Sequence, residues 1–421
     1  MKYDVIVAGA GPAGLCAAVA AAREGSRVAL VERYGIVGGN LTSGYVGPVL
    51  GSVGKGTMRD ELCSLLGVQG NDALGYRADA HDFEAAKLIL AEWIAAEPGI
   101  DVFLQSFVSD VVKDGNRVTG IVCATNGGPL TLEAPVTIDC TGDGVVAFLA
   151  GARVEKGRED GLMQPVTLEY TLDGVDDSRA LYCIGDIDDV RLGGKRFLDW
   201  CLEKSEQGLI PRTIAAVRLH PCTQAGRRQV NTTQVNGVDI TQIPQIFTSD
   251  LELRRQIRLL TSFLRENVPG YENARVVGSG STTGVRESRR VMGDYVITAE
   301  ELARGCRFTD VIVHNADFLV DIHNPSGPGQ AEKTIQHCKP YDLPYRCFLP
   351  AGLEGLMVAG RCISGTHRAH ASYRVMSICM AMGEAAGTAA ALCSSRGCMP
   401  RALPVSEIQE ALLRKGVELF D

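Results

Sequence analysis

The chain has 421 residues, of which 45% are hydrophobic and 22% are charged, values that are ordinary for a globular protein and exclude disordered and fibrous classes. At about 150 residues per domain, this length predicts two connected domains. The net charge is −8 and the sequence has no dense block of Lys and Arg, so a nucleic-acid partner is not expected.

The first predicted element is a short strand over residues 3–8, which is followed by the glycine loop "GAGPAG" (9–14). In a strand, loop and helix of this kind, Gly9 permits the tight turn and Gly11 lets backbone N–H groups approach a pyrophosphate. Gly14 lets the next helix pack on the sheet. A cluster of glycines also occurs in plain turns, so the loop alone is a weak signal.

The elements that follow this loop strengthen the prediction. Residues 15–24 are rich in Ala and predict a helix that ends at Gly25, and residues 27–31 predict a second strand. Glu32 closes that strand, where a carboxylate binds the ribose hydroxyls of a dinucleotide. The complete order of strand, loop, helix, strand and acidic residue therefore predicts a dinucleotide site.

The region up to residue 150 departs from a simple alternation of strands and helices. The loop "RYGIVGGNLTSG" (33–44) comes first, and a helical apolar period covers residues 81–96. Residues 101–112 predict one strand and 118–124 another, and they are separated by the turn "KDGNR". This small antiparallel meander leads into a buried strand within "VTIDCTGDG" (136–144).

Residues 151–280 predict a second region that is inserted between two halves of the first. Strands are expected in 165–175 and 228–237, and 249–267 predicts an amphipathic helix. The loop "GSGSTTG" (278–284) resembles a second nucleotide loop, but no acidic strand end follows it, so we interpret it as a loop on the substrate side. A second nucleotide domain is not expected.

The last region contains a strand at 355–359, the loop "GRCISGTH" (360–367) and a long helix from Ser372 onward. Gly383 and Gly387 are four residues apart, which permits close approach to a sheet or loop beneath the helix. The apolar stretch 378–393 is shorter than the roughly 20 residues that cross a bilayer, and it contains Glu384. We therefore expect an interior helix and no membrane contact.

The 14 cysteines include no C-x-x-C pair, so zinc sites, iron–sulfur ligands and a dithiol motif are not expected. They are interpreted as reduced, mostly buried thiols, and no metal site is predicted. No cationic leader precedes an apolar stretch at the start of the chain, and we expect a cytoplasmic protein.

The glycine loop, "GGN" (38–40), the meander and "DCTGDG" (139–144) together resemble the flavoprotein fold of glutathione reductase type, in the branch that contains fumarate reductase. The segments "DIHNPSG" (321–327), "PYRCFLP" (344–350) and "GLMVAGRCISGTHRAHASYR" (355–374) are similar to the broad bacterial family of FAD-dependent oxidoreductases. The resemblance covers nearly the whole chain and is weakest over 155–270.

The resemblance implies an α/β fold. A discontinuous Rossmann-like FAD-binding domain, with a parallel sheet and the inserted antiparallel meander, would comprise 1–150 and 281–400. An inserted α+β substrate or cap domain would comprise 151–280, and 401–421 would form a C-terminal helical extension. The cofactor is expected to be FAD, held non-covalently.

The resemblance also assigns residues to the cofactor. The pyrophosphate would lie on the first glycine loop, the adenosine ribose at Glu32 and the adenine at the backbone of Val108. Related flavoproteins commonly carry Asp after the glycine of the last motif, whereas this chain has Arg361, a donor that would bind the pyrophosphate directly. The full set is Gly9, Gly11, Pro12, Ala13, Gly14, Glu32, Arg33, Gly38, Gly39, Asn40, Val108, Thr141, Gly142, Asp143, Gly360, Arg361, Val375 and Met376.

Four residues are candidates for catalysis or substrate binding. His370 is the first candidate for an acid or base, since imidazole titrates near 6.5, and a neutral structural histidine is the competing interpretation. His323 either contacts substrate or caps its loop. Arg286 and Arg374 could clamp a carboxylate by forked hydrogen bonds, whereas surface charge is the alternative for the nearby Arg289 and Arg290.

Three functions are compatible with these features. The leading one is an FAD-dependent oxidoreductase that transfers a hydride between a small polar organic substrate and the flavin. The others are a flavin-bearing electron-transfer subunit of a larger redox complex and a non-catalytic flavin-binding protein. Expected partners are the small-molecule substrate and an electron acceptor or redox partner protein, and the chain could form a homo-oligomer.

Overall fold

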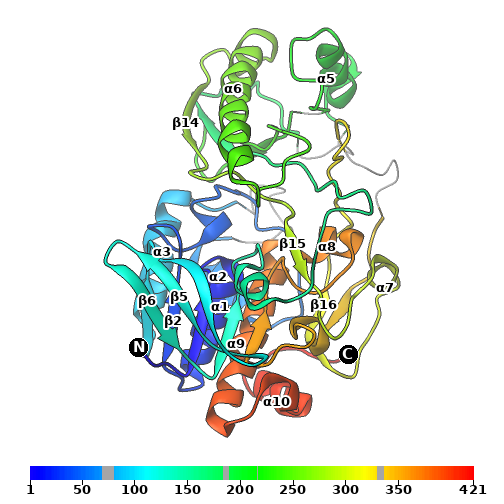
Figure 1. Ribbon diagram of the computed structural model, residues 1–421. Helices are drawn as coiled ribbons and strands as arrows, with labels where there is room; N and C mark the ends of the chain where they lie inside the picture. The colour runs from blue at the N-terminus through cyan, green and yellow to red at the C-terminus, as the bar shows by residue number, and fades with distance from the viewer. Residues whose placement is uncertain (69–79, 184–188, 216, 330–335) are drawn as a thin grey trace.

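The structure, a computed structural model, describes residues 1–68, 80–183, 189–215, 217–329 and 336–421. It has two parts (Figure 1): a main domain, whose core comes from residues 3–154 and 291–419, and a cap, whose core comes from residues 166–274. The main domain lies below the cap in this view. Each part has a hydrophobic core of its own.

A five-stranded parallel sheet forms the centre of the main domain, in the order β18-β7-β1-β2-β3. Ala8 of β1 is paired with Val31 of β2 and Asp139 of β7, so these strands end at one level. The loops that follow them therefore meet at one edge of the sheet, where α/β folds bind ligands. The strands are β1 (Val5–Ala8), β2 (Val28–Val31), β3 (Ile100–Phe103), β7 (Val136–Asp139) and β18 (Leu356–Val358).

Two apolar helices, α1 (Pro12–Arg23) and α9 (Met376–Arg396), pack closely together beside this sheet. A Cβ atom added at Gly383 would lie 2.0 Å from the carbonyl oxygen of Ala13, and one at Gly387 would lie 2.2 Å from that of Ala17. The glycine pair therefore brings α9 onto another helix, and the expectation of a sheet or loop beneath it was wrong.

Helix α9 is long and apolar enough to cross a membrane by length and composition, but 94% of its apolar window is buried inside the protein. The prediction of an interior helix is therefore confirmed. The predicted start at Ser372 was wrong, because Val375 is extended and separates α9 from the short helix α8 (His367–Tyr373). Helix α9 begins at Met376, four residues after the predicted start.

The predicted meander is present, but its first strand differs from the prediction. Residues 101–112 form two strands, because Gln105 adopts a positive φ of 51° and turns the chain. Strand β3 joins the parallel sheet, and the meander begins after the turn, with the order β4-β5-β6. The meander strands are β4 (Phe107–Asp114), β5 (Arg117–Thr125) and β6 (Gly128–Glu133).

The other elements of the main domain surround this centre. Strand β8 (Val154–Lys156) pairs with β15 (Arg289–Val291), and β16 (Val311–Ala316) pairs with β17 (Tyr341–Pro344). A capping box between Thr298 and Glu301 starts α7. The helices are α2 (Met58–Leu65), α3 (Phe83–Ala95), α4 (Val145–Ala150), α7 (Ala299–Arg304) and α10 (Val405–Arg414), with 3₁₀ turns at Gly39–Leu41, Tyr345–Phe348 and Pro400–Ala402.

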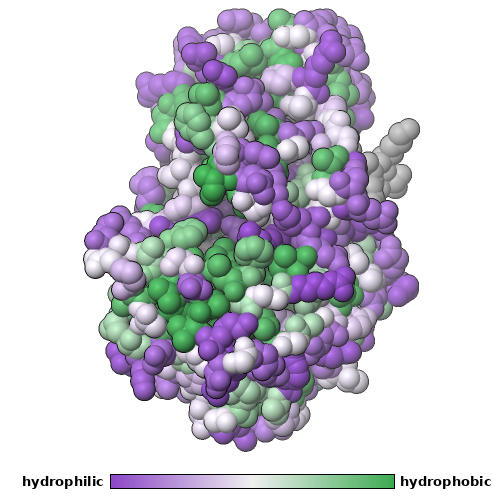
Figure 2. All heavy atoms as spheres, in the orientation of Figure 1, coloured by the Kyte–Doolittle hydropathy of each residue, from purple (hydrophilic) through white to green (hydrophobic). Residues whose placement is uncertain are grey.

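The cap contains a four-stranded antiparallel sheet in the order β12-β13-β9-β14. The helix α6 (Ile243–Asn267) begins six residues before the predicted start and buries Leu253, Leu260 and Leu264. On the face shown in Figure 2, hydrophilic residues cover most of the cap, and hydrophobic residues gather on the main domain. The remaining elements are β9 (Tyr170–Asp173), β10 (Arg191–Leu192), β11 (Lys195–Arg196), α5 (Phe197–Glu206), β12 (Leu219–Pro221), β13 (Arg228–Val230) and β14 (Arg275–Ser279).

All 14 cysteines lie in the described residues, none of them forms a disulfide, and 11 of them are buried. The predicted burial of most thiols is therefore confirmed.

The buried carboxyl group of Glu384 predicts a pH-dependent stability. It accepts the backbone N–H of Met58 at 2.8 Å, yet burial raises its pKa from 4.5 to about 7. Because the folded-state pKa is raised, the stabilisation is fully present below pH 4.5 and is lost as the pH rises through 7. At about 1.4 kcal/mol per pKa unit, the loss is roughly 3 kcal/mol.

The Glu384→Gln variant keeps an acceptor for Met58 and removes the charge, so we expect it to be more stable than the wild type at pH 8 and similar at pH 4.5. Denaturant unfolding at the two pH values measures the difference. Equal stability differences at both pH values would contradict the prediction.

Candidate cofactor and substrate site

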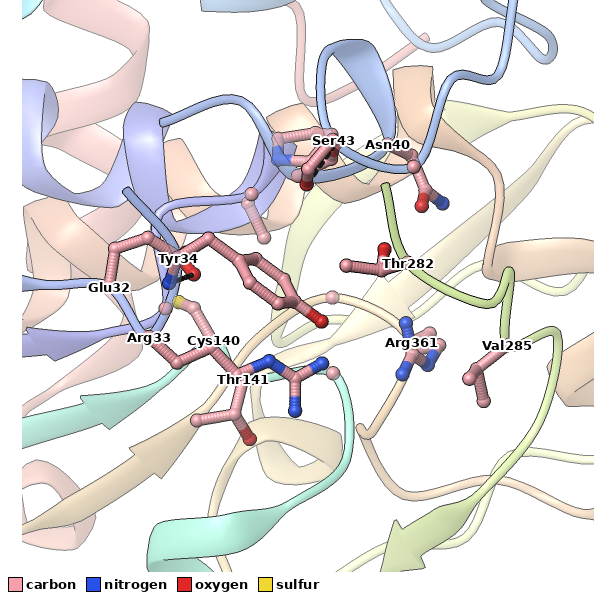
Figure 3. Close-up of a pocket in the computed structure, with 18 of the residues that line it drawn as sticks. Glu32, Arg33, Tyr34, Asn40, Ser43, Cys140, Thr141, Thr282, Val285 and Arg361 are labelled. Atoms are coloured by element: carbon pink, nitrogen blue, oxygen red, sulfur yellow. Dashed lines mark hydrogen bonds between the residues drawn. The ribbon is translucent and has the colours of Figure 1, made fainter. Parts of the chain in front are cut away.

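A cleft lies along the carboxyl edge of the central sheet, where open α/β sheets bind ligands. The loops that follow β1, β2, β7 and β18 contribute Gly9, Glu32, Thr141 and Arg361 to its wall. Figure 3 shows Glu32, Arg33 and Tyr34 on one side of the cleft and Thr282, Val285 and Arg361 on the other. The cleft therefore forms because the strand order brings these four loops to one edge of the sheet.

The three glycines of the first loop have different surroundings. Gly9 has a φ of +97°, and a Cβ atom there would lie 2.5 Å from the carbonyl oxygen of Cys140. A Cβ atom at Gly14 would lie 1.7 Å from the carbonyl oxygen of Gly9. A Cβ atom at Gly11 would have the Cα of Gly39 as its nearest neighbour, 4.0 Å away. Gly9 and Gly14 are thus required by the fold, whereas Gly11 faces space that a ligand can fill.

Helix α1 begins at this open space. Gly11 is its N-cap and Pro12 is its first residue, so the N–H groups of Ala13 and Gly14 have no acceptor within the helix. These donors and the helix dipole favour a phosphate group. Because Gly11, Pro12 and Ala13 line the cleft, the residues fit the pyrophosphate of a dinucleotide.

Glu32 is fixed at one end of the cleft. Its Oε2 accepts the N–H of Ala10 at 2.7 Å and its Oε1 accepts the N–H of Tyr34 at 2.9 Å. Each carboxylate oxygen has two lone pairs, so capacity remains for a donor such as a ribose hydroxyl. Val108 lines the same end. The arrangement fits an adenosine ribose at Glu32.

A buried carboxylate holds two arginines beside the cleft. Asp143 forms an ion pair with Arg361, lies 3.3 Å from Arg33 and accepts the hydroxyl of Ser288 at 2.7 Å. Burial acts to raise the pKa of Asp143, but Arg361 and Arg33 outweigh it, so the pKa is lowered. Asp143 does not line the cleft, whereas Arg33 and Arg361 do. The cofactor-facing groups here are the two cations.

Some of the other predicted cofactor residues line the cleft and some do not. Those that line it are Gly39, Asn40, Thr141, Gly142, Gly360 and Met376, and those that do not are Gly14, Gly38 and Val375. Gly38 has a φ of +111°, where a Cβ atom would clash with Thr42. Lining residues that the sequence did not single out include Tyr34, Ser43, Cys140, Thr282, Thr283, Val285 and Cys379.

The loop "GSGSTTG" was interpreted as a loop on the substrate side. Its Thr282 and Thr283 line the cleft itself, because the backbone N–H of Ser281 bonds to Ser43 at 2.9 Å and draws the loop to the main domain. The loop thus forms part of the cleft wall between the cap and the main domain.

Arg374 also lines the cleft, just before α9. Its Nη2 donates to the backbone and side-chain oxygens of Asp321 at 3.0 and 3.1 Å, and its buried Nε has no partner in the described part of the chain. Asp321 also lies 3.4 Å from Nε2 of His323. This carboxylate therefore joins two of the four predicted substrate residues.

Arg286 and His323 do not line the cleft, but Arg286 lies near enough to Arg374 for their charges to interact. Arg286 donates to the carbonyl oxygen of Pro165 at 3.0 Å and to the amide oxygen of Asn231 at 3.3 Å, both neutral acceptors. Burial and the charge of Arg374 lower the pKa of Arg286 to about 9. Among the described residues, the buried Nε2 of Gln164 has no partner, whereas Nδ1 of the neutral His323 is an acceptor, since Nε2 faces Asp321. Nε of Arg374 and Nε2 of Gln164 therefore lack an acceptor, which an anion would supply.

His370, the first candidate for an acid or base, does not line the cleft. It is 1% exposed, its ring packs edge-on against Tyr373, and its Nδ1 has no partner. Burial and the cations Arg374 and Arg290 lower its pKa well below 6.5. The imidazole is therefore neutral, as in the structural interpretation. Burial and Arg286 likewise lower the pKa of His323 to about 3.

Arg290 is not a surface charge. It is 2% exposed, pairs with Glu287 and donates to the carbonyl oxygens of Gly157 and Gly365. Arg289 covers the ring of Phe148 at 4.1 Å. Neither arginine lines the cleft, so both act in packing.

Comparison with known proteins agrees with this geometry. The profile of the family described as FAD dependent oxidoreductase matches residues 4–412. Thiamine thiazole synthase of Pyrococcus horikoshii is 32% identical over 165 residues, which are 35% of this chain, and the match spans 62% of the synthase. Digeranylgeranylglycerophospholipid reductase of Picrophilus torridus is 29% identical over 161 residues, 34% of this chain and 40% of the reductase.

Among solved structures, a flavin-dependent brominase has a TM-score of 0.51 at 14% identity, and the match covers 97% of this chain and 83% of the brominase. This likeness shows the fold alone: an α/β core with a parallel sheet and additional antiparallel sheets. FAD is the cofactor of the matching family, and the brominase is flavin-dependent.

Two substitutions in the glycine loop separate cofactor binding from folding. We expect Gly11→Val to fold, since the φ of −76° at Gly11 suits any residue. The variant should purify without FAD, since the valine side chain would occupy only the cleft. Gly14→Val should fail to fold, because its Cβ meets backbone. Circular dichroism and the flavin absorbance of both purified variants measure this, and a yellow Gly11→Val protein would contradict it.

The purified protein should carry FAD, and acid precipitation should release it into the supernatant, because no covalent link is expected. Chromatography of the supernatant identifies the flavin. FMN in place of FAD would contradict the role of Glu32. Colour that stays with the pellet would contradict non-covalent binding and direct attention to Cys140 and Cys379, two thiols that line the cleft.

Proposed function

Because the chain belongs to the family of FAD-dependent oxidoreductases, we propose that it transfers a hydride between FAD and a small polar substrate that carries a carboxylate or similar anion. The observation that supports this substrate class most directly is the group of unpaired donors beside Arg374. A buried donor without an acceptor costs about 1–3 kcal/mol, and an anionic oxygen removes that cost.

The chain's residues would divide the work along the cleft. The start of α1, Arg33 and Arg361 hold the pyrophosphate, and Glu32 holds the adenosine ribose. When bound, FAD supplies the two-electron chemistry by accepting or donating a hydride. Arg374 and Arg286 bind the anionic group of the substrate and fix its orientation, and the cap excludes water from this end of the cleft.

Asp321 orients this pocket. Its carboxylate is bonded to Arg374 and lies beside His323, so the guanidinium keeps one face for a substrate and the imidazole keeps its position. Arg286 donates to Asn231 of the cap, so this arginine lies where the cap meets the main domain. A substrate would bridge the main domain and the cap, which is where flavoprotein substrates meet the reacting edge.

The finer assignment, to the fumarate reductase branch of the glutathione-reductase-type fold, rests on the sequence motifs at 38–40, 139–144 and 321–327. The cytoplasmic location, the small-molecule substrate and a second electron carrier are proposals from the sequence as well.

A panel of substrates tests the proposal. Small hydroxy and amino carboxylates, such as glycolate, lactate and alanine, are mixed with the enzyme without oxygen, each beside a neutral alcohol or amine of the same size. We expect bleaching of the flavin absorbance only by members with a carboxylate. Equal bleaching by the neutral partners would contradict the anionic substrate.

With a reducing substrate in hand, Arg374→Met should raise KM about 10- to 100-fold with little change in kcat, the expected result for a charged hydrogen bond that stabilises ground and transition states alike. Arg275→Met is the matched control, since this arginine is 73% exposed on the cap and pairs with Asp173. A wild-type KM in Arg374→Met would remove Arg374 from substrate binding.

A further inference from the structure

A groove on the cap, which we call the α6 groove, lies between α6 and β14 and is separate from the cleft. The two elements are side by side in Figure 1. The α6 side contains Arg254, Arg258 and Arg265, and the β14 side contains Arg275 and Val276. No acidic residue of the described chain lines this groove. The groove is therefore strongly basic, although the whole chain has a net charge of −8.

Two of the four arginines have a carboxylate partner and two do not. Arg254 pairs with a carboxylate on α6, and Arg275 pairs with one on β9, both at 2.8 Å. Arg265 donates to a backbone oxygen at 3.3 Å, which is a neutral acceptor. Within the described part of the chain, neither Arg258 nor Arg265 forms an ion pair. Two positive charges are therefore left in the groove, and such a concentration of charge attracts an anionic partner.

The exposed face of α6 continues from these arginines toward the start of the helix. Phe247 and Leu251 are 71% and 39% exposed. They precede Arg254, Arg258 and Arg265 at steps of three, four or seven residues, and the three arginines are exposed as well. Residues at these steps lie on one face of a helix. This face is therefore apolar near its start and basic further along.

Strand β14 offers a free edge beside the arginines. It is the last strand in the order β12-β13-β9-β14, so one edge pairs with β9 and the other has no partner among the described strands. Its residues Arg275, Val276 and Val277 are all exposed. An unpaired edge of this kind can pair with an extended segment of another chain.

The groove adjoins the wall of the cleft. The Nη1 of Arg254 donates to the hydroxyl of Ser279, the last residue of β14, at 3.4 Å. The next residue, Gly280, donates its N–H to the backbone oxygen of Glu169, a buried residue just before β9, at 3.0 Å. The chain then continues into the cleft wall at Thr282. An occupant of the groove would therefore lie beside a loop that lines the cleft.

We propose that the α6 groove binds an acidic, extended segment of a partner protein. This inference does not depend on the proposed function. The carboxylates of the segment pair with Arg258 and Arg265, and its backbone pairs with the free edge of β14. Apolar side chains at one end of the segment cover Phe247 and Leu251.

The order of residues along α6 favours a protein segment over other anions. A helix that lies on a bilayer carries its apolar and basic residues on opposite faces, whereas α6 carries them one after the other on the same face. A nucleic-acid backbone would use the arginines and leave Phe247, Leu251 and the edge of β14 exposed. A protein segment uses the charges, the apolar residues and the strand edge together.

A synthetic peptide tests the proposal. The probe is fluorescein-labelled LFETETETEFL, which alternates Glu with Thr and has apolar residues at both ends, so that either direction of binding is tested. Fluorescence anisotropy measures its affinity for the full chain with FAD bound. Arg258→Glu should weaken binding about tenfold, because the reversal replaces attraction by repulsion. Hydrogen exchange should show that the peptide protects the backbone N–H groups of residues 275–279.

Arg255→Glu is the matched control. Arg255 is exposed on the same helix and does not line the groove, so this variant makes the same change in net charge and should bind the peptide nearly as the wild type does. The flavin absorbance of both variants verifies that they fold. Equal weakening by Arg255→Glu would show an effect of net charge alone and overturn the inference.

Three further results would overturn the proposal. The first is no saturable binding of the peptide by the wild type, and the second is binding without protection of β14. The third is a different occupant: phosphatidylglycerol vesicles or a single-stranded DNA oligonucleotide that binds more tightly than the peptide, or a dimer of this chain that Arg258→Glu dissociates. Sedimentation measures the vesicle binding and the oligomeric state, and anisotropy measures the DNA.

Discussion

The close contact between α1 and α9 is the constraint on which the site depends. Helices normally pack with their axes about 8–10 Å apart, according to the side chains between them. Gly383 and Gly387 place no side chain at this contact, and a Cβ atom at either would collide with the backbone of α1. The contact brings the first turns of both helices, at Pro12 and Met376, to the same cleft. The N-terminal ends of two helices therefore meet at the cleft, and both helix dipoles favour an anionic group there.

A second feature is that buried carboxylates hold basic side chains around this cleft. Asp143 holds Arg33 and Arg361, and Asp321 holds Arg374 beside His323. Glu287 does the same for Arg290 and His367. Asp143 serves two arginines and Arg286 donates to neutral acceptors, so the arginines outnumber these carboxylates, whereas the neutral His323 adds no charge. Such an excess costs free energy in a buried region unless anions bind, and a pyrophosphate with an anionic substrate would supply them.

Sequence reasoning succeeded where local spacing determines structure. The strand, glycine loop, helix and Glu32 follow one another within 32 residues, and the cleft is lined by Gly9, Gly11 and Glu32 as predicted. It failed where contacts between distant segments decide. The isolation of His370 depends on Arg290 and Arg374, which pack around it from separate segments. The burial of Glu169 depends on Gln229, which lies 60 residues further along the chain. No sequence motif marks Glu169 or Gln229.

The excess of cations also explains why the histidines are poor candidates for proton transfer. Protonation of an imidazole adds a positive charge among Arg286, Arg374 and Arg290, and burial adds to the cost. Ionisation of a carboxyl group adds a negative charge instead, which the cations favour and burial opposes. The two effects on Glu169 partly cancel, so its pKa comes near 7 rather than far from neutrality.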